Sequence, residues 1–133
     1  RKENKLSGLT LKTKAKLLND TFASGSLYAG LLTKMALDTA GSEVYSELVA
    51  ASYKRMPISF SITSSNEISN NASVKFPEAR EDWGQIIGVG IFDSLSGGNL
   101  VSYAIFDVRD VVIIHSLMQY EVAKDFYVAG FRM

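Results

Sequence analysis

The segment DWGQIIGVGIFDSLSGGNLVSYAIFDV, residues 82–108, decides the fold, because its glycines have two competing interpretations. In a dinucleotide-binding site, such glycines lie in the turn between a strand and a helix whose N-terminus faces the pyrophosphate. Here Gly88 and Gly90 interrupt an apolar run, and no helical pattern follows them. They are therefore predicted to lie inside a strand, where a glycine marks a bulge, a bend or the close approach of another backbone.

The turn of this segment comes later, at residues 95–99. Gly97, Gly98 and Asn99 supply the positive backbone angles that a hairpin connection needs. Residues 85–107 are therefore predicted to form a β-hairpin and not a phosphate-binding loop. Trp83, Ile91 and Phe92 are its expected core residues, since large apolar side chains dominate core energetics.

Composition indicates one soluble globular domain. The chain has 133 residues, of which 47% are hydrophobic, enough to bury a core. No apolar run approaches the roughly 20 residues that a membrane-spanning helix needs, so no membrane contact is predicted. The absence of cysteine excludes disulfides, thiol catalysis and thiolate metal sites. No cofactor is predicted.

Charge is unevenly distributed along the chain. Residues 1–18 hold six basic residues and a single acidic one, a net charge of +5, which leaves −5 for the remainder. This segment would be either a basic arm that docks on an acidic partner or on nucleic acid, or the solvated face of a helix. No aromatic side chain lies among the lysines to stack on bases, so nucleic-acid binding is not predicted.

Two structural units are expected. Residues 1–25 would form a basic arm followed by a helix, with Thr10 as N-cap and Gly25 as the stop. One face of that helix carries apolar residues at helical spacing, namely Leu11, Ala15, Leu18 and Phe22. Residues 26–133 would form a β domain.

The β domain is read from short alternating runs. Strands are expected at 27–33, 72–76 and 111–114, with two more pieces in 118–132, whereas 39–51 is either a short helix or a long loop. The clearest alternation puts Met56, Ile58, Phe60 and Ile62 on one side of a strand, with Arg55, Ser59 and Ser61 on the other; Pro57 makes it an edge strand. Polar turns are expected at 64–71 and 107–110. Seven or eight such strands predict an antiparallel β-sandwich, of jelly-roll or Greek-key type, behind an N-terminal helix.

Catalytic signals are weak. His115 is the single histidine and follows an apolar run, without the strand-turn-helix context of a nucleophile elbow. The neighbouring acidic pairs at 81–82 and 107–110 are interleaved with Arg80 and Arg109, which favours ion pairs in turns over acid-base catalysis. No acidic loop of the EF-hand type is present, so no metal site is predicted.

A sugar-binding role is the alternative to assembly. Trp83, Tyr103 and the loop 93–99 would then form the site, with the indole as a stacking platform for a host surface glycan. The competing interpretation, which we prefer, is that Trp83 closes one end of the sandwich.

Several motifs together resemble a known family. They are YKRMPISF, with Tyr53 and Arg55; ISNNASVKFPEAREDWG, with the Asn70-Asn71 and Phe76-Pro77 pairs and the tripeptide 82–84; and GIFDSLSGGNLVSYAIF, with 90–93 and 97–100. Over residues 27–106 the chain resembles small bacteriophage virion proteins that are usually called tail fibre or minor tail proteins. The resemblance implies a non-enzymatic structural component of a tailed-phage virion, assembled in the host cytoplasm, either in a tail fibre or as a capsid decoration protein.

The resemblance also implies contacts with other virion proteins and a homo-oligomer, for which analogy suggests a trimer. The arm and the first helix are expected to supply the contact. Leu6, Leu9 and Leu11 would be buried against a neighbour, while Lys12, Lys14 and Lys16 would face an acidic surface.

Overall fold

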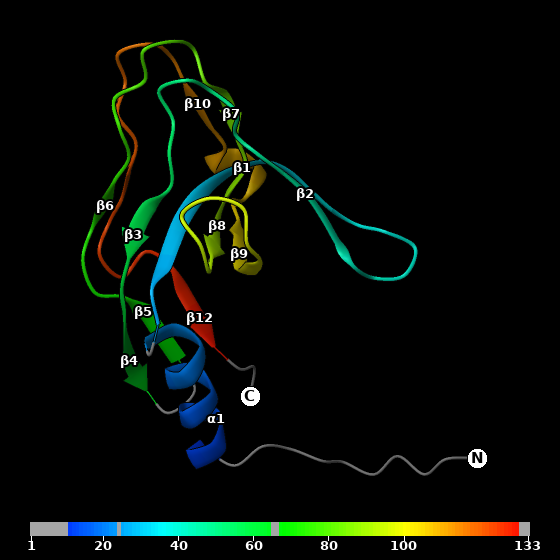
Figure 1. Cartoon of the computed structure of the whole chain (residues 1–133), viewed down its shortest axis with the longest axis vertical. Coiled ribbons are helices and arrows are strands. Elements are labelled where there is room, and N and C mark those ends of the chain that lie inside the picture. Colours follow the sequence, from blue (N-terminus) through cyan, green and yellow to red (C-terminus); the bar gives the residue numbers. More distant parts are fainter. Residues whose placement is uncertain (1–10, 24, 65–66, 131–133) are drawn as a thin grey trace.

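The computed structural model describes residues 11–23, 25–64 and 67–130 (Figure 1). The fold is mainly antiparallel β, with sandwich-like sheets and one short helix at the N-terminal end, which confirms the predicted fold class. The helical elements are α1 (Leu11–Leu18), the π-helical turn Asn19–Ala23 and the 3-10 turn Val108–Asp110. The strands are β1 (Leu27–Leu37), β2 (Glu43–Glu47), β3 (Met56–Ile58), β4 (Phe60–Ser64), β5 (Glu67–Asn70), β6 (Val74–Lys75), β7 (Gly84–Ile86), β8 (Gly88–Phe92), β9 (Leu100–Ile105), β10 (Val112–Ile114), β11 (Glu121–Val122) and β12 (Val128–Gly130).

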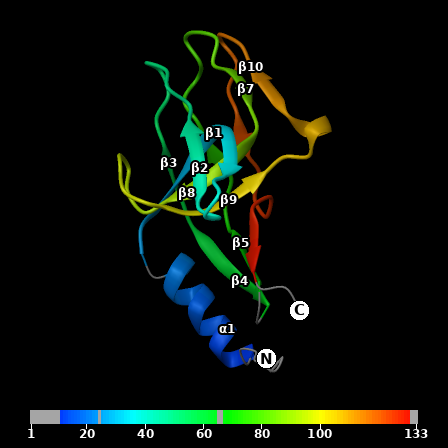
Figure 2. The same cartoon turned by 90° about the vertical axis from the view of Figure 1, so that its right-hand side faces the viewer.

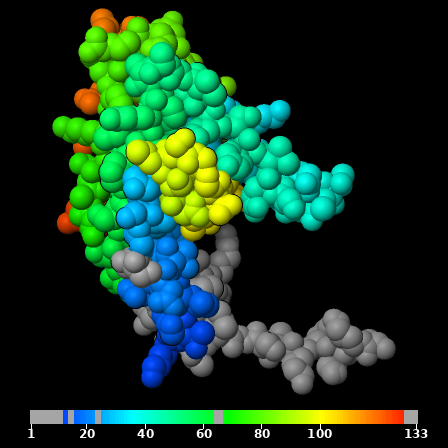
Figure 3. Space-filling model, in the orientation of Figure 1, coloured from blue at the N-terminus to red at the C-terminus, as the bar shows by residue number. Residues whose placement is uncertain are grey.

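The largest sheet is built around β1. Along one edge β1 pairs with β3 and then with β2, and along the other with β8, which in turn pairs with β9. The first half of β1 is buried and the second half is mostly exposed. The exposed half forms, with β2, a hairpin that projects from the body of the molecule (Figures 1 and 3).

Strand β2 corrects the expectation of a helix or a long loop at 39–51. Residues 43–47 pair with the end of β1, and a turn at 38–42 connects the two strands. In that turn one carboxylate oxygen of Asp38 accepts hydrogen bonds from the backbone N–H groups of Ala40 and Ser42, each at 2.9 Å. Because the hairpin projects, β2 has no buried apolar face, and the sequence therefore lacks a strand pattern there.

The predicted hairpin at 85–107 is confirmed, and it bends. Its first arm consists of β7 and β8, joined at Ile87; β7 pairs with β10 and β8 with β9. Backbone hydrogen bonds at Ile87 keep the pairing continuous, to the carbonyl of Leu32 at 2.9 Å and from the N–H of Phe106 at 2.8 Å. At Gly90 a β-carbon would lie 2.9 Å from Leu100 Cδ1, so the glycine permits close packing inside a strand.

The second layer contains β12, β5 and β4 in one sheet, with β6 and β11 beside it. The polar turn expected at 64–71 is therefore wrong for 67–70, which form the central strand of that sheet. The layers meet through their side chains: the hydroxyls of Ser102 and Tyr127 are hydrogen-bonded at 2.6 Å.

The single strand expected at 55–62 is two strands in different sheets. Chain direction changes at Ser59, so β3 pairs with β1 whereas β4 pairs with β5. The predicted division into a buried and an exposed side of this strand is confirmed only in part, because Arg55 is buried and Ile62 is 42% exposed. Breaks of this kind explain why the described residues contain twelve short strands where seven or eight were expected.

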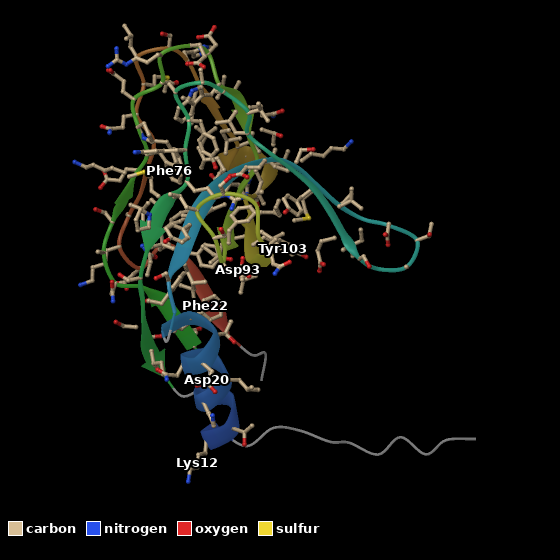
Figure 4. All side chains as sticks on the ribbon, in the orientation of Figure 1. Lys12, Asp20, Phe22, Phe76, Asp93 and Tyr103 are labelled. Atoms are coloured by element: carbon tan, nitrogen blue, oxygen red, sulfur yellow. The ribbon has the colours of Figure 1, made fainter. Side chains whose placement is uncertain are left out.

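The helix lies at one end of the molecule, beside β4 and β5 (Figures 1 and 2). Two residues of its predicted apolar face, Leu18 and Phe22, are buried in the common core. The ring of Phe22 packs edge to face on Phe60, with centroids 5.0 Å apart. Figure 4 places Phe22 at the end of the helical segment near the strands and Lys12 at the far end.

A buried amide joins the second layer to the last segment of the chain. Asn70 is fully buried; its Nδ2 donates to the carbonyls of Ala72 and Ala123 at 2.9 and 2.8 Å, and its Oδ1 accepts from the N–H of Tyr127 at 2.8 Å. Every polar atom of this side chain therefore has a partner.

Replacing Asn70 by Leu should lower the free energy of unfolding by about 2–4 kcal/mol, because it leaves buried backbone groups without partners. Urea denaturation measures the effect. The matched control is Asn71→Ala at an exposed neighbour, for which a loss below about 1 kcal/mol is expected. Equal losses in both variants would contradict the role of Asn70.

Candidate functional site

A network of polar contacts surrounds Arg55. Its guanidinium donates from Nε and Nη2 to the two carboxylate oxygens of Glu47, at 2.9 and 2.8 Å. The same group lies over the ring of Phe92, 3.7 Å from the ring centroid. Burial and a bidentate carboxylate contact make this a strong ion pair in a protected position, and the hydrogen bond to Glu47 raises the pKa of Arg55 further.

Arg55 also holds the loop at 93–99. Its Nη1 donates to the carbonyl oxygens of Ser94 and Gly97, at 2.7 and 2.8 Å. The loop closes on itself because Asp93 accepts from the N–H of Asn99 at 2.7 Å and from its Nδ2 at 3.1 Å. These bonds, the backbone one first, hold the pKa of Asp93 below its ordinary value.

Tyr53 completes this cluster. Its hydroxyl donates to Glu47 Oε2 at 2.5 Å and accepts from the N–H of Leu31 at 2.9 Å. Burial, followed by the hydrogen bond to Glu47, raises the pKa of Tyr53 far above its ordinary range. We call Glu47, Tyr53, Arg55 and Phe92 with the loop 93–99 the Arg55 cluster. It borders a cavity of about 370 Å³ that Leu48, Lys54 and Leu95 also line.

A second polar group surrounds Trp83. The indole is 5% exposed, and its Nε1 donates to Ser52 Oγ at 3.0 Å. Ser52 in turn donates to Glu81 at 2.5 Å, and this bond is the main reason that the pKa of Glu81 is lowered. Trp83 packs edge to face on Tyr53. A buried indole offers no free face for a sugar ring, which removes the stacking platform from the glycan hypothesis.

The remaining residues that the sequence singled out in the hairpin lie in β8, in β9 and in the loop between them. Ile91 and Phe92 are fully buried in β8, and Gly97 and Gly98 both have positive φ, 66° and 70°. Tyr103 is 38% exposed on β9 and belongs, like Asp93, to the β8–β9 hairpin (Figure 4).

Among the residues expected to contact a partner, Lys12 and Lys16 are exposed on α1, and Lys16 is ion-paired with Asp20 at 2.8 Å. Leu6 and Leu9 lie outside the described residues, as do the side chains of Leu11 and Lys14.

Most of the ionisable residues that were considered for catalysis are exposed, whereas Glu81 is half-buried and hydrogen-bonded to Ser52. His115 is 3.8 Å from Asp82, and both side chains are largely exposed. Arg109 pairs with Asp107 as expected, but Arg80 pairs with Glu78 and not with Glu81. Within 11–23, 25–64 and 67–130, no three residues among His, Asp and Glu are grouped as metal ligands would be.

No helix in the described part of the chain is long and apolar enough to cross a membrane.

Sequence reasoning missed Arg55 and Glu47 as buried partners. Arg55 was expected on the exposed side of a strand, and Glu47 was placed in an ambiguous segment. The only available signal was the presence of Tyr53 and Arg55 in the family-like motif YKRMPISF. In the structure, several of that family's motif residues contact one another: Arg55 binds the loop 93–99, and Tyr53 stacks on Phe76 with centroids 6.3 Å apart.

Comparison with known proteins places the chain in the class of bacteriophage structural proteins. Residues 3–114 match the family described as podophage GP4 fiber I protein gp80. The chain belongs to this family of phage fibre proteins, which confirms the predicted resemblance and gives it a virion structural role. A search of curated proteins found no match.

The two loop glycines should respond differently to substitution. A side chain at positive φ costs about 1–2 kcal/mol, so Gly97→Ala, where the β-carbon meets open space, should lose about that much. Gly98→Ala should lose more, because its β-carbon would also collide with the carboxylate of Asp93 and with Ser94. Thermal unfolding of both variants measures which one loses more stability. Melting temperatures equal to the parent's would refute the assignment of Gly97 and Gly98 to a turn that needs positive φ.

Alkaline pH should destabilise the protein through its buried tyrosines. Unfolded tyrosine has a pKa of about 10. Burial raises the pKa of Tyr127 to about 12 and that of Tyr53 higher still. Their stabilising contribution is thus complete below about pH 10 and is lost as pH rises above it, by up to about 1.4 kcal/mol per pH unit for each tyrosine.

Urea unfolding at several pH values on both sides of about 10 measures this slope. Tyr53→Phe should make the slope shallower by roughly one tyrosine's share. Tyr127→Phe should make the slope shallower as well. A slope in both variants equal to the parent's would contradict the assignment.

Proposed function

We propose that this chain is a non-enzymatic subunit of a tailed-phage fibre, which binds other virion proteins and oligomerises with copies of itself. The observation that carries this proposal is the family match over residues 3–114. The contacts of the motif residues support it, because the polar groups of Arg55, Tyr53 and Trp83 bind partners inside the chain. These residues stabilise the fold, and the outer surfaces of the domain are then the ones that contact other virion proteins.

A place in the tail fibre is preferred over a place on the capsid. The family's description as a fibre protein supports the tail. Capsid decoration is the second location, and antibody labelling of intact particles distinguishes the two. Assembly in the host cytoplasm, without nucleic acid or membrane as partner, completes the proposal.

The N-terminal unit, residues 1–25, is the proposed attachment to the neighbouring virion protein. Leu18 and Phe22 anchor its helix in the core, while Lys12 and Lys16 lie on exposed positions of the same helix. The basic charge of residues 1–18 fits an acidic docking surface. Leu6, Leu9 and Leu11 would supply apolar contacts there, and Lys14 would add to the charge.

Deleting residues 1–10 should leave a folded 26–133 domain that no longer enters the particle. The measurement is mass spectrometry of purified virions from an infection in which the variant replaces the parent. Lys12→Glu combined with Lys14→Glu should also reduce incorporation, since it reverses charge without shortening the chain.

Parental incorporation of both variants would show that the arm is a solvated tail. Absence of the parental polypeptide from purified virions would refute the virion role itself.

A further inference from the structure

Strand β9 has an open edge that no charged residue and no proline protects. It ends the large sheet, pairs with β8 on one side, and has no strand partner on its other side within the described residues. Natural edge strands carry charges, proline or bulges that discourage pairing with another chain. At the opposite side of this sheet β2 has the exposed Glu43, and β3 has Pro57. The sequence of β9, LVSYAI, contains neither a charge nor a proline, and its one irregularity is a register shift at Val101 in the pairing with β8.

The outer face of β9 is apolar along its whole length. Alternate residues Val101, Tyr103 and Ile105 are 37–45% exposed. The residues between them are more buried, and Ser102 is hydrogen-bonded to Tyr127 in the other layer. An apolar stripe therefore lies directly beside the open backbone edge.

The same strand borders a mostly apolar groove. The groove has a volume of about 650 Å³ and lies between β9 and residues near β12; its apolar lining includes Ile105, Phe106, Val112, Tyr120, Phe126 and Val128, and Asp107 and Asp110 also line it. Phe126 and Val128 are about half exposed. Apolar surface thus continues from the stripe into the groove, an arrangement that marks an interaction site.

We propose that β9 pairs with β9 of a second copy, antiparallel and about a two-fold axis at Tyr103. A two-fold contact brings the same patch of both copies together, so the patch must be complementary to itself. Centred on Tyr103, the pairing places Tyr103 opposite Tyr103 of the partner subunit, and Val101 opposite Ile105 of the partner subunit. Every exposed apolar residue of the stripe then has an apolar partner across the axis.

The distribution of charged residues favours β9 of a second copy over β2 of a second copy as the partner of this edge. In the same register Asp107, two residues beyond β9, lies opposite Asn99 of the partner subunit, so no like charges meet across the strands. Pairing of β9 with β2 of another copy would instead place the apolar stripe beside an edge strand that carries the exposed charge of Glu43. A two-fold contact yields dimers, or even-numbered assemblies when a second interface exists, in contrast to the trimer expected by analogy.

Cysteine cross-linking tests both the contact and its register, because the chain has no native cysteine. Directly opposite residues in an antiparallel pair have Cα atoms about 4.5–5.5 Å apart, within the range of a disulfide. Tyr103→Cys should therefore give a disulfide-linked dimer under mild oxidation. Val101→Cys and Ile105→Cys should each stay monomeric in a denaturing gel when alone but form a mixed dimer when combined.

A second measurement does not depend on oxidation. Ile105→Lys places charges at the edge and should halve the molar mass measured by light scattering relative to the parent. Val44→Lys, at an exposed position of β2 on the other side of the sheet, is the matched control and should keep the parental mass.

The proposal is overturned if Tyr103→Cys yields no cross-link, if the mixed pair yields no more dimer than either variant alone, or if the parent is a monomer or a trimer. It is also overturned if deletion of residues 1–10 abolishes self-association while Ile105→Lys preserves it, because the arm would then be the contact between copies. None of these outcomes depends on the chain's place in the virion, so the proposed fibre role is judged separately.

Discussion

The guanidinium of Arg55 joins the end of β2 to the end of β8 and the loop that follows β8. It donates to Glu47, lies over Phe92, and donates from Nη1 to the carbonyls of Ser94 and Gly97. Removing a charge from water is costly unless it is paired and hydrogen-bonded. Once Arg55 is buried, the positions of the loop 93–99 and of Glu47 follow from that requirement.

The same constraint explains the tight packing around Glu47. Its carboxylate receives hydrogen bonds from Arg55 and from the hydroxyl of Tyr53, which also binds the backbone of β1. The space beside Gly30 in β1 is filled by these groups, since a β-carbon there would lie 2.8 Å from the Tyr53 hydroxyl. A glycine inside the central strand is thus a consequence of a buried polar cluster and not of a turn.

Local patterns in the sequence predicted the elements that local physics determines. The apolar face with Leu18 and Phe22 and the glycines of the loop 93–99 each depend on neighbouring residues, and the structure has a helical segment and a turn there. The Arg55 cluster and Asn70 could not be predicted in this way. Their partners, such as Gly97 for Arg55 and Tyr127 for Asn70, become neighbours only after the layers form.

The missed strands have a related cause. A strand is recognised from sequence by one buried face, and β2 has none because its hairpin projects from the sheet. Strand β5 has the opposite pattern, with Ile68, Ser69 and Asn70 all buried. Polar residues in a row resemble a turn, and only hydrogen bonds to distant segments, such as that of Ser69 to Asp125, make their burial favourable.

The last segment of the chain completes the domain, although the family match ends at residue 114. β11 pairs with β6 and β12 pairs with β5, so two strands of the second layer, β5 and β6, have partners from this segment. Val122 and Tyr127 contribute buried side chains, and Tyr120 packs on Phe76 and Phe106. Without these residues, Asn70 would lose two of its three partners and β5 one of its two neighbouring strands.

This last segment lies outside the family match, yet its strands pair with strands of the same chain. A segment that served only to contact a particular neighbour in the virion would have its apolar residues on the surface. Here Phe126 and Val128 are about half exposed, whereas Tyr127 between them is buried in the core. The segment therefore has two structural tasks, since it completes the second layer of the sandwich and forms one wall of the groove at the open edge of β9.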